Sequence, residues 1–152
     1  MKSKILNKFL ILFILSFFDF TLADDEFIFE SNTIELKENE NLIIAKGNVK
    51  INSTNEIDIF ADESKYFKLS KKLFLSGNVK IIDKKKKIII QSDKIEYDKS
   101  IELIKTFNET LVKINDLYNI KTSNLNYLQL EKTLKSSEKT TLTDNFENNI
   151  IA

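Results

Sequence analysis

The sequence contains no cysteine, no histidine and no proline, and it has only two glycines. Without cysteine and histidine the chain cannot form disulfides, and it lacks thiol and imidazole nucleophiles and the usual ligands of zinc, copper and haem. Catalysis would therefore require a carboxylate pair, an activated lysine or an activated hydroxyl in a specific arrangement. We expect neither a metal site nor a cofactor.

An excess of charge of one sign is also absent. The 23 basic residues, all of them lysine, are balanced by 23 acidic residues. The chain as a whole therefore has no positive field that would attract nucleic acid. Its 42% hydrophobic and 30% charged residues are ordinary for a folded domain with a core. The composition predicts one folded domain that does not bind nucleic acid.

The first residues have the pattern of a signal peptide. Three lysines precede an apolar run, residues 9–18, and small residues follow at Thr21 and Ala23. The apolar run is shorter than the roughly 20 residues that a membrane-spanning helix needs. We predict that residues 1–23 are cleaved and that residues 24–152 are exported to a bacterial periplasm; a retained anchor is the alternative.

A glycine motif occurs twice, as Ala45-Lys-Gly-Asn-Val-Lys-Ile51 and Leu75-Ser-Gly-Asn-Val-Lys-Ile81, with the glycines 30 residues apart. After each glycine, apolar residues alternate with asparagine and lysine, which gives a strand one apolar face and one polar face. A helical period of 3.6 would scatter the polar residues among the apolar ones. The motif therefore predicts β-strands.

A second pattern recurs with nearly the same period. The segments 31–36, 61–66, 92–97 and 122–127 each begin with a small residue and end in Leu or Tyr, and their starts differ by 30, 31 and 30 residues. A fixed period of this size is typical of stacked repeats. We expect about three short strands in each unit, joined as hairpins and meanders by polar links of about five residues. The longer predicted strands are 42–51, 57–61, 73–82, 88–91, 107–114 and 118–121.

These patterns together resemble the OstA-like, or organic solvent tolerance, family. The resemblance rests on the paired Gly-Asn-Val-Lys-Ile strands, the steps Ala61-Asp62 and Ser92-Asp93, and the aromatic residues Tyr66 and Tyr97. The OstA-like domain occurs in the lipopolysaccharide-transport proteins LptA and LptC and in the N-terminal part of LptD. The resemblance covers about residues 27–144.

Two later segments, 118–127 and 134–144, are most similar to the N-terminal periplasmic domain of LptD. The chain lacks the cysteines of many LptD proteins, and it lacks their outer-membrane barrel. The alternatives are therefore an LptA-like carrier and a truncated LptD. We expect the domain, residues 24–152, to stop within a repeat.

The resemblance implies an all-β fold, a twisted and open β-jellyroll or β-sandwich built from ~30-residue repeats of short antiparallel strands. It implies that lipid A acyl chains of lipopolysaccharide lie in the apolar interior. It also implies that OstA-like domains join end to end by strand pairing, as a bridge across the Gram-negative periplasm to outer-membrane assembly partners.

The alternation within the predicted strands places ten apolar residues on the inner face. They are Ala45, Val49, Ile51, Ile57, Ile59, Leu75, Val79, Ile81, Ile88 and Ile90. Ile95 and Tyr97 follow a three-residue step in the pattern, so the alternation does not decide which face of the sheet they occupy. Each methylene buried in an apolar site is worth about 0.8 kcal/mol, so a continuous apolar trough would remove most of the cost of moving acyl chains through water. We expect these residues to bind lipid; a sandwich core without ligand is the alternative.

Two groups of charged residues remain. Lysines 84–87 are most simply a solvated turn that discourages edge pairing, and contact with anionic sugar phosphates is the alternative. Asp62, Asp93 and Glu96 could form a carboxylate pair for glycoside cleavage, but acids repeated at equivalent turns are more simply turn or capping residues. The sequence thus favours a non-enzymatic lipid carrier. A structural or adhesive β-repeat protein is the second hypothesis, and a carbohydrate-active enzyme is the third.

Overall fold

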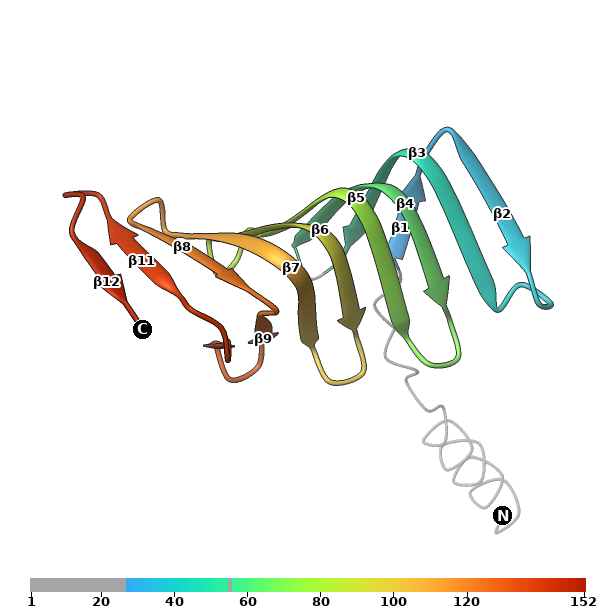
Figure 1. The fold of residues 1–152 in the computed structure, drawn as a ribbon. Coiled ribbons are helices and arrows are strands. Elements are labelled where there is room, and N and C mark those ends of the chain that lie inside the picture. Colours follow the sequence, from blue (N-terminus) through green and yellow to red (C-terminus); the bar gives the residue numbers. More distant parts are fainter. Residues whose placement is uncertain (1–26, 55) are drawn as a thin grey trace, which may run out of the picture.

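The computed structural model describes residues 27–54 and 56–152, so the predicted signal peptide lies outside the described residues. The described part forms one antiparallel sheet of twelve strands (Figure 1). Within it, no helix could span a bilayer. The five long strands are β3 (Leu42–Ser53), β4 (Ile57–Phe67), β5 (Lys72–Asp83), β6 (Ile88–Asp98) and β7 (Leu103–Ile114). The short strands are β1 (Phe27–Glu30), β2 (Thr33–Lys37), β8 (Tyr118–Ser123), β9 (Asn126–Leu128), β10 (Thr133–Lys135), β11 (Thr141–Asp144) and β12 (Asn149–Ile151).

The five long strands and β8 follow one another as a meander, in the order β3-β4-β5-β6-β7-β8. The predicted all-β class and hairpin order are confirmed. The expected three short strands per unit are wrong, because the predicted strand 57–61 and the marker 61–66 are one continuous strand, β4. Its pairing with β3 continues on both sides of an irregularity between Lys46 and Val49. The break in the apolar–polar alternation therefore marks a bend within β4. The strand continues through it.

Each long strand bends at a corner. In β3 the buried residues on either side of the corner, Ala45 and Val49, are four positions apart; in β4 the corresponding residues, Ala61 and Ser64, are three apart. Two residues of β3 therefore lie opposite one residue of β4, which is a β-bulge. A bulge bends the strand and increases its twist. Similar irregularities between β5 and β6 and between β6 and β7 carry the bend along the sheet.

The bend divides the sheet into two halves that face each other. Half A contains β2, β9, β10 and the segments 42–46, 63–67, 72–76, 94–98 and 103–107. Half B contains β1, β8, β11, β12 and the segments 49–53, 57–61, 79–83, 88–92 and 110–114. In Figure 1 the bends lie along the top of the molecule.

The duplicated Gly-Asn pairs occupy two of these corners. Gly47 and Gly77 have φ angles of 74° and 75°, and the asparagines after them also have positive φ. Glycine adopts this backbone without strain, and asparagine tolerates it better than most residues. Asp62 packs over Gly77 and accepts a hydrogen bond of 2.9 Å from Asn78 Nδ2. The repeat of the motif within the chain therefore reflects a backbone requirement of the corner.

The hairpin turns form two rims on the open side of the bent sheet. Rim A consists of the connections β2–β3, β4–β5, β6–β7 and β9–β10, and rim B of β3–β4, β5–β6 and β7–β8. Backbone hydrogen bonds join neighbouring turns within each rim, as from Lys99 N–H to the Lys71 carbonyl in rim A and from Asn115 N–H to the Lys87 carbonyl in rim B. Each rim is thus a continuous stack of turns. The space between the rims is called the mouth below.

Candidate functional site

The ten residues predicted for the inner face all lie in the interior between the halves. None of them is more than 9% exposed. Four of them, Ile51, Ile59, Ile81 and Ile90, are direct partners on adjacent strands of half B. Their burial confirms the predicted face, whereas lipid contact at these residues stays a prediction.

The same row continues to both ends of half B. It crosses nine strands and consists of Phe29, Ile51, Ile59, Ile81, Ile90, Val112, Ile120, Leu142 and Ile150. Every member is apolar, and exposure rises to 64% only at Ile150 in the last strand. An uninterrupted apolar wall therefore runs along the molecule.

A second inner row belongs to half A and was largely missed by the sequence reasoning. It consists of Leu36, Ile43, Tyr66, Leu73, Tyr97, Ile104, Tyr127 and Leu134. Ile95 and Tyr97, whose face was open, are each 1% exposed. The corner of β6 shifts the alternation by one residue between Ser92 and Ile95, which brings both side chains inside. The recurrence of tyrosine at Tyr66, Tyr97 and Tyr127 is the signal that could have found this row.

Hydroxyl groups line the corner in the later repeats, which the sequence reasoning also missed. The Ser92 Oγ lies 2.9 Å from the carbonyl oxygens of Phe107 and Glu109. The hydroxyls of Thr106 and Thr110 are 2.6 Å apart, and Thr106 accepts a hydrogen bond from Leu125 N–H. These hydroxyls form hydrogen bonds with backbone groups at the corner of the third repeat, which has no glycine. The inner side of the corner is therefore lined by polar side chains in β6 and β7.

Aromatic residues close one part of the mouth. The ring of Phe27 in β1 lies 5.1 Å from that of Tyr66 and 5.9 Å from that of Tyr97, centroid to centroid. The Lys99 ammonium lies 4.8 Å from the centre of the Phe27 ring, in cation–π geometry. Phe27 belongs to half B and the tyrosines to half A, so this contact joins the two halves.

The predicted lysine turn, 84–87, is confirmed as the β5–β6 connection. Lys84 forms an ion pair of 2.7 Å with Asp58, and Lys86 forms one of 3.3 Å with Asp83. The carboxylate of Asp83 also accepts a 2.8 Å hydrogen bond from the Lys86 backbone N–H. Part of the positive charge of this turn is thus neutralised by carboxylates of the adjacent strands β4 and β5.

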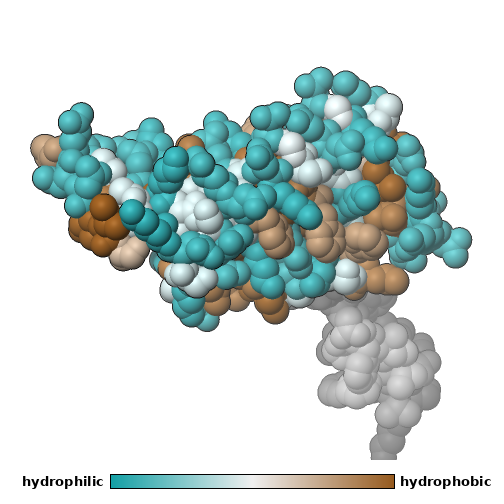
Figure 2. All heavy atoms as spheres, in the orientation of Figure 1, coloured by the Kyte–Doolittle hydropathy of each residue, from teal (hydrophilic) through white to brown (hydrophobic). Residues whose placement is uncertain are grey.

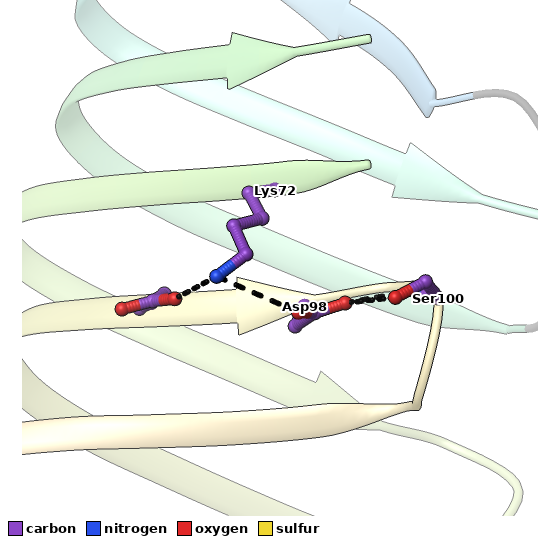
Figure 3. A network of polar contacts seen from close by, with 4 residues as sticks. Lys72, Asp98 and Ser100 are labelled. Carbon is purple, nitrogen blue, oxygen red and sulfur yellow. Dashed lines mark hydrogen bonds and ion pairs between the residues drawn. The ribbon is translucent and has the colours of Figure 1, made fainter. Parts of the chain in front are cut away.

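Two of the three acids considered for catalysis, Asp62 and Glu96, have structural partners. Asp62 caps a corner, as described above, and Asp93 is exposed at the corresponding corner of β6. Glu96 accepts a hydrogen bond of 3.1 Å from Lys72, which raises the pKa of that lysine. Lys72 also pairs with Asp98, whose pKa is lowered chiefly by the hydrogen bond from the Ser100 hydroxyl (Figure 3). No group of three or more acids in the described residues could hold a metal ion.

Apolar side chains are exposed at both ends of the sheet. In β2, which pairs only with β3, Ile34 and Leu36 are 47% and 55% exposed. In β12, which pairs only with β11, Ile150 and Ile151 are each 64% exposed. Figure 2 shows hydrophobic atoms near these two ends and in patches between them, among mainly hydrophilic atoms. The inner rows therefore end at open strand edges.

Comparison with known proteins supports this architecture. No curated protein matches the chain in sequence. The fold is similar to the crystal structure of LptH, the LptA-homologous periplasmic component of the lipopolysaccharide transport device of Pseudomonas aeruginosa, with a TM-score of 0.64 and 10% identity over 84% of this chain and 94% of that chain. This similarity confirms the predicted open β-jellyroll. A family model of OstA-like proteins matches residues 16–133, well over half of the sequence, and the chain therefore belongs to the OstA-like family.

Proposed function

We propose that this protein is a non-enzymatic lipopolysaccharide carrier of the periplasm that serves lipopolysaccharide transport and outer-membrane assembly. The observation that carries the proposal is the apolar row of half B, which crosses nine strands and reaches an open edge at each end. Membership of the OstA-like family and the fold shared with a periplasmic transport component also support it.

The energetics of acyl chains explain why such a wall would be useful. A chain of a dozen methylenes costs about 10 kcal/mol to expose to water, at about 0.8 kcal/mol for each methylene. A lipid with several chains would therefore cross an aqueous space too rarely to supply a membrane. The two inner rows face each other across the bent sheet, and separation of the halves would provide an apolar slot for the chains.

Photo-crosslinking tests the proposal. A photoreactive residue at Ile59, Val79 or Ile90 is expected to form covalent adducts with lipopolysaccharide, because these side chains lie in the interior. Phe60 and Gln91 are matched controls, because each is next to a tested residue and on the opposite face of its strand. Mass spectrometry of the adducts is the measurement, and absence of adducts at all three inner positions would refute the carrier.

The structural or adhesive alternative is tested at Val79, which is 1% exposed. Val79→Thr retains the shape of the side chain and adds one hydroxyl. A carrier is expected to lose affinity for lipopolysaccharide in this variant while circular dichroism shows a folded domain. A protein that only packs its own core would lose stability and show no lipid binding before or after the change.

We also propose that the exposed edges pair end to end with another OstA-like domain. Strands β1 and β2 form one end of the sheet and β10 and β12 the other, and an unpaired edge is a ready template for strand addition. Apolar residues continue into these edges, so pairing would also extend the inner rows. A second copy of this chain is the simplest partner to test.

The double variant Ile34→Asp with Leu36→Asp is expected to abolish concentration-dependent self-association, because it places two charges at the edge of β2. Sedimentation velocity over a range of concentrations is the measurement. Leu69→Asp is the control, because Leu69 is 84% exposed but lies in a turn of rim A, away from the strand edges. Assemblies that persist in the double variant, or a wild-type protein that is monomeric throughout, would contradict self-pairing.

A further inference from the structure

A cavity of about 710 Å³ lies in the mouth, between the two rims. Rim B contributes Asp83 and Lys86 to its lining, with Ile57 at the start of β4 beside them. Rim A contributes Gln129 and Leu130 from the β9–β10 connection. The side chain of Ile57 is buried and that of Leu130 is 77% exposed, so the lining includes both a buried and an exposed apolar residue.

The two rims touch beside this cavity. The amide Nε2 of Gln129 donates to Asp83 Oδ2 over 3.4 Å, and the two residues are 46 positions apart in the chain. The ammonium of Lys86 pairs with the same carboxylate and lies 5.7 Å from the centre of the Tyr127 ring. Gln129, Asp83 and Tyr127 are all at most 3% exposed. Unlike the aromatic contact at Phe27, the mouth is closed here by buried polar side chains.

This closure leaves polar atoms without partners. Gln129 Oε1 and the Tyr127 hydroxyl are buried and form no hydrogen bond within the described structure. Burial of an unpaired polar group is unfavourable, so contact at this point is weaker than apolar packing would be. Burial raises the pKa of Tyr127, and the nearby Asp83 raises it further, so the hydroxyl stays protonated near neutral pH and can donate. The acceptor belongs to a residue that lines the cavity, and the donor belongs to Tyr127, whose ring contacts Lys86 of the same lining.

The charge of the cavity decides which ligand chemistry fits. Its lining contains three lysines and three acids, so the formal charges cancel. The lining residues of these types are Lys85, Lys86, Lys132, Glu56, Asp83 and Glu102. A strongly anionic group would gain no net Coulomb attraction from this balance. An uncharged group that carries hydroxyls or amides would satisfy both the donor and the acceptor.

Resting on the proposed function, we infer that the mouth at Asp83, Tyr127 and Gln129 binds the uncharged sugar part of an amphiphile whose acyl chains enter the interior. A sugar hydroxyl donates to Gln129 Oε1 and another accepts from the Tyr127 hydroxyl. Binding separates Gln129 from Asp83, because the same opening must admit the chains. The mouth is therefore a site for the sugar head group, next to the apolar interior.

The variant Gln129→Leu tests the site, because it retains the approximate size of the side chain and removes its hydrogen bonds. Affinity for lipopolysaccharide is expected to fall about tenfold, as for loss of one to two hydrogen bonds, while affinity for a fluorescent fatty acid without sugar stays unchanged. Gln91→Leu on the outer face of β6 is the matched control and should change neither affinity. Microscale thermophoresis with both probes measures this.

The outcomes separate the two proposals. A wild-type protein that binds neither probe overturns the carrier function and the sugar site with it. A wild-type protein that binds both probes, with Gln129→Leu affecting both equally or neither, overturns the sugar site alone. Selective loss of lipopolysaccharide binding supports the site.

Opening of the mouth can be tested separately because the chain has no cysteine of its own. The double variant Asp83→Cys with Gln129→Cys can be joined by a short bismaleimide. Lipopolysaccharide binding is expected to fall at least about tenfold in the joined protein relative to the same variant without the reagent. Single-cysteine variants treated with the reagent control for its attachment. Equal binding by the joined and unjoined protein would show that the rims need not separate.

Discussion

Replacing Ile81 by alanine is expected to lower the free energy of unfolding by about 3 kcal/mol, within the usual range of about 2–5 kcal/mol for such a change. Ile81 is 1% exposed and lies between Ile59 and Ile90 in the inner row of half B. Truncation removes three buried carbon atoms and leaves a cavity that the stiff sheet cannot readily close. Urea unfolding followed by circular dichroism measures the loss.

The neighbouring residue supplies the control for this prediction. Ile82 has the same side chain, but it points to the outer face of β5 and is partly exposed. Ile82→Ala should therefore cost only about 1 kcal/mol, since less apolar surface is removed from a packed environment. Equal losses for the two variants would contradict the assignment of the inner face. The comparison also tests the structure independently of any ligand.

Gly77→Ala is expected to have the second large effect, a loss of about 2–5 kcal/mol in the free energy of unfolding. The left-handed backbone at Gly77 costs a residue with a Cβ about 1–2 kcal/mol, and overpacking typically adds about 1–3 kcal/mol. The added Cβ would lie only 2.8 Å from the Cβ of Asp62. The loss is measured by urea unfolding of the variant and the wild type.

Two further variants separate the steric effect from the backbone effect. Gly47 has nearly the same φ as Gly77, but a Cβ there would lie 3.2 Å from Asn32 Cβ, with only the amide Nδ2 closer, at 2.7 Å. Gly47→Ala should therefore cost less than Gly77→Ala. Combining Gly77→Ala with Asp62→Gly should cost less than the two single changes together, because the clash is removed. Simple additivity would show that the backbone alone accounts for the loss.

The inner face of the first two repeats could be predicted because it depends on local alternation. Between Ile57 and Ile59, or between Val79 and Ile81, side chains alternate without interruption, and the buried side is the apolar one. The corners could not be predicted in the same way. The buried residues on either side of a corner are three or four positions apart, and the number depends on how the strand pairs with its neighbour. Ser92 and Ile95 in β6 are an example. Counting along one strand does not contain that information.

The closure of the mouth depended even more on tertiary structure. In the sequence, Asp83 is the last residue before a lysine turn, and Gln129 is a polar residue between two short strands. Nothing near either residue in the sequence indicates that they meet, because they come from turns in opposite rims.

The sequence by itself determined the all-β class, the 30-residue phase of the repeats and the apolar inner face of the first two repeats, since each follows from the spacing of residues along the chain. The tertiary structure decided where the strands bend, which tyrosines lie inside and which polar groups close the mouth. These features depend on contacts between residues in different strands. Such contacts exist only after the sheet has folded back on itself.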